Sequence, residues 1–210
     1  TNGWAVDNGG GIWLVSSSPI ITNSEISENE SGGVYCYLSS PIMRNLNISD
    51  NTKPNVNSRG GGIYISSSIG PKISNSIVSN NFAYQGGGIA IFEDSQVILN
   101  SNNISNNTAQ WDGGGLMFAT SSVEITDMVI KSNTAGEGAG IAIYGASAGT
   151  NTIQNVLIIS NEASSRGGGI FLSQSVNPIF DNLIIINNHS GSHGGGLYSE
   201  ADGGWGGYTI

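Results

Sequence analysis

Acid–base chemistry on an acidic sugar would need a carboxylate cluster that holds Ca²⁺ and an Arg or Lys base beside it. The sequence contains one pair of adjacent carboxylates, Glu93-Asp94, and six basic residues. The six basic residues are Arg44, Lys53, Arg59, Lys72, Lys131 and Arg166. They share no position in the repeat described below, and no carboxylates converge on them. We therefore predict no catalytic residues and no enzymatic activity, with a polysaccharide lyase or glycoside hydrolase as the alternative.

Histidine and cysteine are the other residues that could act as metal ligands or nucleophiles. His189 and His193 are four residues apart, a spacing that brings two ligands together on a helix but not in a strand and corner. Cys36 is the only cysteine, and it stands where the repeat places an inward aliphatic residue. We expect exposed histidines, a buried inert thiol, no metal site and no cofactor.

The element that positions all other residues is a glycine phrase followed by an aliphatic residue. Its last small residue falls at positions 11, 33, 62, 88, 115, 140, 169 and 196. Intervals in the twenties are typical of a solenoid, in which each repeat buries its apolar face only by stacking on its neighbours. After the glycines the pattern alternates, as in Gly62-Ile63-Tyr64-Ile65, which predicts a short strand with its isoleucines pointing inward.

A second phrase, Ile-x-x-Asn, alternates with the first. Asparagine tolerates a left-handed corner, and its amide can both donate and accept along a stack of coils. We predict a structural ladder of these residues: Asn29, Asn51, Asn80, Asn107, Asn133, Asn161 and Asn188.

A looser aliphatic segment lies between the two phrases, so each repeat has three short strands separated by Gly, Ser and Asn corners. This predicts an all-β parallel β-helix of about eight coils, forming one domain over residues 1–210. Residues 52–59 exceed the usual spacing and are expected to bulge outward as a loop.

Aromatic residues occupy the outward positions of the strands that follow the glycines. In a parallel stack these positions form two columns, which could stack on sugar rings, dock a protein or simply cover the sheet. The candidate ligand-binding residues are Trp13, Tyr35, Tyr37, Tyr64, Phe92, Tyr144, Phe171 and Tyr198.

The Gly-Gly-Gly-Ile and Ile-x-x-Asn phrases resemble the repeats of chlamydial polymorphic outer-membrane proteins, in which a GGAI-type motif alternates with an FxxN-type motif. The resemblance covers about residues 9 to 200, with Ile standing where that family has Phe. It implies a right-handed parallel β-helix that is surface-exposed or secreted, often adhesive, and usually cut from a larger polypeptide.

The composition disfavours several classes of binding partner. The net charge of −9 disfavours nucleic acid and anionic membrane surfaces, and no apolar run is long enough to span a bilayer. We predict an extracellular or cell-surface structural or adhesive solenoid. Its expected partners are host or cell-surface glycans or proteins. If the chain is a stacking subunit rather than a segment of a longer chain, other copies of itself are expected to bind end to end. A carbohydrate-interacting β-helix is the alternative.

Overall fold

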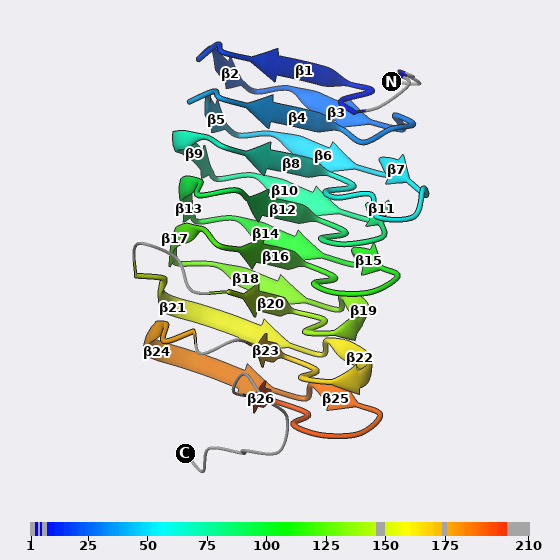
Figure 1. Ribbon diagram of the computed structural model, residues 1–210, viewed down its shortest axis with the longest axis vertical. Coiled ribbons are helices and arrows are strands. Elements are labelled where there is room, and N and C mark those ends of the chain that lie inside the picture. Colours follow the sequence, from blue (N-terminus) through cyan, green and yellow to red (C-terminus); the bar gives the residue numbers. More distant parts are fainter. Residues whose placement is uncertain (1–2, 4, 6–7, 146–149, 174–175, 201–210) are drawn as a thin grey trace.

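The chain winds into a rod of stacked coils, seen here in a computed structural model that describes every residue except 1–2, 4, 6–7, 146–149, 174–175 and 201–210 (Figure 1). The described residues contain strands and no helix, and their strands pair in parallel between successive coils. The predicted all-β parallel β-helix is therefore confirmed. No helix in the described part of the chain could cross a membrane.

The strands that follow the glycine phrases form one eight-stranded sheet, here called sheet A. Each of its strands pairs with the strand at the same position one coil further on. Sheet A consists of β1 (Ile12–Val15), β4 (Val34–Tyr37), β8 (Ile63–Ser66), β12 (Ile89–Phe92), β16 (Leu116–Ala119), β20 (Ile141–Tyr144), β23 (Ile170–Leu172) and β26 (Leu197–Ser199).

The second and third segments of each repeat together form sheet B. Near the C-terminal end two long strands, β21 (Thr152–Ile159) and β24 (Ile179–Ile186), run through both positions and join the two rows into one sheet. The first row contains β2 (Ile20–Thr22), β5 (Ile42–Arg44), β9 (Ile69–Ser74), β13 (Gln96–Asn100) and β17 (Ser122–Thr126). The second row contains β3 (Glu25–Ser27), β6 (Asn47–Ser49), β10 (Ile77–Ser79), β14 (Asn103–Ser105) and β18 (Val129–Lys131).

A third sheet of short strands, sheet C, closes each coil before the next glycine phrase. Its first strand includes Thr52 and Lys53, so only the later part of the predicted loop protrudes, with Val56 exposed. Sheet C consists of β7 (Thr52–Lys53), β11 (Phe82–Ala83), β15 (Thr108–Ala109), β19 (Thr134–Glu137), β22 (Glu162–Arg166) and β25 (His189–Ser190).

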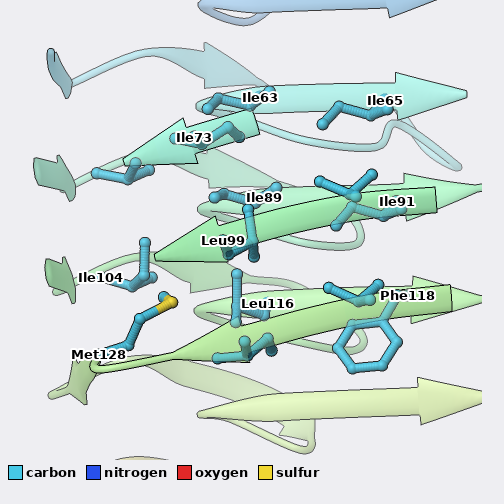
Figure 2. Packing of buried hydrophobic residues seen from close by; sticks show 14 of the residues in the cluster. Ile63, Ile65, Ile73, Ile89, Ile91, Leu99, Ile104, Leu116, Phe118 and Met128 are labelled. Atoms are coloured by element: carbon cyan, nitrogen blue, oxygen red, sulfur yellow. The ribbon is translucent and has the colours of Figure 1, made fainter. Parts of the chain in front are cut away.

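The interior is a continuous stack of aliphatic side chains (Figure 2). In sheet A, Ile63 pairs with Ile89 and Ile89 with Leu116, and all three are buried. Burying each such side chain contributes about 1.5–3 kcal/mol, which is the main source of stability in a chain this poor in charge.

Glycine is required where the coils approach most closely. Gly113 has φ +66°, a left-handed conformation that most side chains disfavour. A Cβ on Gly115 would lie 2.7 Å from the carbonyl oxygen of Gly140 in the next coil. The glycine phrase therefore combines a tight turn with backbone contact between coils.

A line of buried asparagine side chains runs along the stack where sheet B turns into sheet C. The Oδ1 of Asn107 accepts hydrogen bonds from the backbone N and the Nδ2 of Asn81 (3.0 Å each), one coil earlier. Its own Nδ2 donates to the Oδ1 of Asn133 (3.1 Å) and to the carbonyl of Val78 (2.9 Å). The asparagines in this line are Asn29, Asn51, Asn81, Asn107, Asn133, Asn161 and Asn188.

The prediction of Asn80 as a ladder residue is wrong. Val78 is buried while Ile77 is 47 % exposed, so the inward aliphatic of this coil lies one residue later than the phrase Ile-x-x-Asn suggests. Asn81 consequently takes the ladder position, and Asn80 adopts the left-handed corner conformation with φ 55°.

Candidate functional site

The outer face of sheet A carries the aromatic residues in register. Trp13 pairs with Tyr35, Tyr35 with Tyr64, and Phe171 with Tyr198 across neighbouring strands. The Trp13 and Tyr35 rings meet edge to face, with centroids 5.6 Å apart. This part of the sheet therefore presents a run of rings along the rod axis.

The aromatic face is not open along its whole length. Phe92 is buried and Phe171 has no exposed surface, so the expectation that these two rings are accessible is wrong. Ala90, Met117 and Ala142 fill the middle of the face and are also buried, forming with Phe92 a second small apolar cluster outside the sheet. A ligand could reach the rings only towards the two ends.

A column of polar residues covers the middle of this face. These residues directly precede the glycine phrases and are aligned coil by coil through isolated bridges and sheet C: Arg59, Gln85, Asp112, Glu137, Arg166 and His193. The expectation that the basic residues share no register is therefore wrong for Arg59 and Arg166, and the expectation that no carboxylates converge on them is wrong for Arg166.

Cations of this polar column and its neighbour Lys53 lie over the rings. The Cζ of Arg59 is 4.0 Å from the centroid of Phe92, and that of Arg166 is 5.2 Å from Phe171. The Nζ of Lys53 is 5.3 Å from the centroid of Tyr64. Such cation–π contacts contribute about 0.5–2 kcal/mol each and explain how a polar layer can cover apolar rings.

Carboxylates gather in the C-terminal half of the polar column. Arg166 forms an ion pair with Glu137 (2.6 Å) and a second one with Glu200. The hydroxyl of Tyr144 donates to the Oε2 of Glu137 (3.2 Å). Six polar residues on four coils are thus connected into one network when Asp112 and Tyr198 are included.

Asp112 is the carboxyl of this network whose pKa is raised by its surroundings. Burial raises its pKa to about 7 against the lowering effect of the Tyr144 hydrogen bond, and the nearby charge of Glu137 raises it further. The residue is only 2 % exposed, and its Oδ1 is closed off from solvent without a hydrogen-bond partner. Although a neutral and a charged carboxyl side by side suit acid–base chemistry, Asp112 cannot touch a ligand in this arrangement.

The N-terminal end of the aromatic face contains a pocket of about 460 Å³. Trp13, which is 51 % exposed, and Tyr35 form one wall, while the loop of residues 54–58 forms the other. Lys53 donates from its Nζ to the Oδ1 of Asn8 at the pocket, and to the carbonyl of Arg59 at 3.4 Å. Sequence reasoning found the two rings but not the loop residues that enclose them.

Three other candidates came from the sequence: Cys36, the pair His189 and His193, and Glu93. Cys36 is buried, and burial raises the pKa of its thiol to about 12. His189 and His193 are exposed, and no group of three or more potential metal ligands occurs among the described residues. Glu93 accepts hydrogen bonds from Ser66 and Ser67 at a corner of the rod.

Two family models match the chain. One, described as the right-handed β-helix region, matches residues 53–188. The other, described as the repeat of the chlamydial polymorphic membrane proteins, matches residues 182–200. No curated protein and no solved structure matches the sequence.

Proposed function

The chain belongs to the right-handed β-helix family, and from this premise we propose that it is a surface-associated, non-enzymatic adhesive rod that binds carbohydrate. The observation that carries the proposal is the pocket between Trp13, Tyr35 and the loop of residues 54–58. The matched repeat at residues 182–200 supports a place at the outer membrane or cell surface.

The chemistry of the pocket suits a sugar. Exposed aromatic rings present flat apolar surfaces with polar tips, on which the C–H face of a pyranose can stack. Asn55 and Asn57, both exposed, supply amides that both donate and accept, which matches the mixed donors and acceptors of sugar hydroxyls. Burial and the neighbouring Tyr64 raise the pKa of Tyr35, which keeps its hydroxyl protonated as a donor.

The small accessible area around the pocket also favours a sugar over a protein partner. A specific protein interface needs about 800 Å² from each partner, whereas the polar column covers the middle of the aromatic face, where the side chains of the small apolar cluster are also buried. A sugar needs only a few rings and convergent polar groups, as the pocket provides.

Binding to an array of defined oligosaccharides tests the proposal. We expect wild-type protein to bind a subset of glycans, and Trp13→Ala and Tyr35→Ala to lose that binding. Ile77→Ala is the matched control, because Ile77 is an exposed side chain on sheet B, away from the pocket. No binding by wild type, or equal binding by Trp13→Ala, contradicts the proposed function.

The absence of enzymatic turnover belongs to the same proposal. It rests on the enclosure of Asp112, the one carboxyl among the described residues whose pKa is raised to a value that suits a general acid near neutral pH. Incubation with polyuronates and with neutral polysaccharides is expected to release no unsaturated product and no reducing ends. Release of either by wild type, and its loss in Asp112→Asn, would show that the carboxyl becomes accessible and acts in catalysis.

End-to-end stacking is a second proposed property, supported by the last long strand. β24 pairs with β21, and no other described strand pairs with β24. Residues 201–210, on which the sequence-based expectation also drew, lie outside the described residues. Negative-stain electron microscopy over a concentration series should show fibres of uniform width; isolated rods at every concentration would contradict stacking.

A further inference from the structure

A second pair of stacked rings lies outside the aromatic face of sheet A. Tyr84 and Trp111 occupy the same position in successive coils, where the chain leaves sheet C. Their ring planes differ by 8° and their centroids are 6.3 Å apart. Trp111 is 56 % exposed, and none of the contacts that hold the polar column together uses either ring.

The backbone holds Trp111 in place on both sides. Its N–H donates to the carbonyl of Tyr84 (2.9 Å), and its own carbonyl accepts from the backbone N–H groups of Gly136 (2.6 Å) and Glu137 (3.0 Å). An exposed tryptophan on so well hydrogen-bonded a backbone loses little conformational freedom when a ligand binds.

An extra residue places the indole outward. Thr108 pairs with Thr134 and Asp112 with Glu137, so residues 109–111 lie opposite residues 135–136 of the next coil. Such a β-bulge redirects a side chain and is common beside functional sites. The next coil has Gly136 beside the backbone of Trp111, where a Cβ would lie 2.6 Å from the Trp111 oxygen, so no side chain lies over the ring from that position.

The paired rings adjoin the pocket through one residue. Ser58 lines the pocket, and its Oγ accepts a hydrogen bond from the backbone N–H of Tyr84 (2.9 Å). The coil of Trp111 is four strands along sheet A from that of Trp13, which is about 19 Å at a strand spacing of about 4.8 Å. The two surfaces together span several sugar rings along the rod.

We propose that Tyr84 and Trp111 form a second subsite, so that the ligand of this rod is an extended oligosaccharide rather than a mono- or disaccharide. The proposal rests on the proposed carbohydrate binding and adds a chain-length requirement to it. The surroundings favour a sugar as occupant. Among the described residues of sheet C and its outgoing turns, the only other exposed large hydrophobic side chain is Val56, too little apolar surface for a protein partner.

Titration with a length series tests the subsite. The probe is the best-bound structure from the oligosaccharide array, prepared from disaccharide to hexasaccharide, with affinity measured by calorimetry. Wild-type affinity is expected to rise with length. Trp111→Ala should lower the affinity for the longer oligosaccharides by about tenfold or more and leave the disaccharide affinity unchanged. Trp111→Phe should retain most of the increase in affinity with length.

The outcomes separate this subsite from the pocket. Loss of disaccharide binding in Trp13→Ala, together with an unchanged length series in Trp111→Ala, overturns the second subsite and leaves the pocket standing. An affinity that does not rise with length in wild type overturns it as well. No binding by wild type to any glycan overturns the pocket itself. Because Trp111 is exposed, equal thermal unfolding temperatures of variants and wild type serve as the folding control.

Discussion

Replacing Asn107, a ladder residue in the middle of the rod, by alanine should be strongly destabilising. The side chain is fully buried and makes four hydrogen bonds. Its loss leaves two buried donors without a partner, the backbone N–H of Asn81 and one Nδ2 hydrogen of Asn81, whereas the carbonyl of Val78 still faces its neighbour in the strand ladder. At about 1–3 kcal/mol for each unpaired buried group, we expect a loss of about 2–6 kcal/mol.

Urea unfolding followed by far-UV circular dichroism measures this loss against a matched variant in the same coil. Asn103 is half-buried, lies in β14, and its Oδ1 has no hydrogen-bond partner. Asn103→Ala should therefore cost less than about 1 kcal/mol. If Asn107→Ala shifts the urea midpoint no further than Asn103→Ala does, the hydrogen bonds between coils contribute no net stability and the reasoning fails.

Three further perturbations follow from burial. The folded-state pKa of Asp112, about 7, exceeds its ordinary value of 3.8. The stability of wild type relative to Asp112→Asn should therefore fall by at most about 4 kcal/mol between about pH 4 and about pH 7 and then level off. Urea midpoints of the two proteins that move in parallel across this range would contradict this prediction. Gly115→Ala should lower the thermal unfolding temperature markedly, because its Cβ would lie 2.7 Å from the oxygen of Gly140; an unchanged temperature would mean that the coils can separate at low cost. Cys36 should resist a disulfide reagent at pH 8 in the native state and react fully in urea, since burial raises its thiol pKa to about 12; rapid native labelling would show that the coil opens.

Much of the architecture could be predicted from the sequence because the glycine phrases are nearly invariant. They set the register of sheet A, and with it the alignment of Trp13, Tyr35 and Tyr64. The error at Asn80 arose where two aliphatic residues, Ile77 and Val78, stand side by side. Only the three-dimensional position of the corner decides which of them is buried, and no period within one repeat contains that information.

Sheet C was beyond prediction for a related reason, and the polar column was missed although the glycine after each member marks its position. The strands of sheet C are as short as two residues, as at Phe82–Ala83, and such strands have no alternation to detect. The turn after them differs in length between coils, with one more residue before Asp112 and Arg166 than before Gln85 and Glu137, so counting forward from sheet C places these two pairs out of register. Counting back from the glycine phrase that each of them directly precedes aligns all four.

Different parts of each coil are constrained to different degrees. The buried asparagines and the glycines fix the distance between coils, because a mismatch in either leaves unpaired amides or clashing backbone. The turn between sheet C and the glycine phrase carries no such constraint, since it lies outside both lines. Variation in length is therefore tolerated there, and it is there that the chain places the loop beside Trp13 and the bulge that presents Trp111. A ligand specificity that changed between related rods would be expected to change in this turn first, with the interior left as it is.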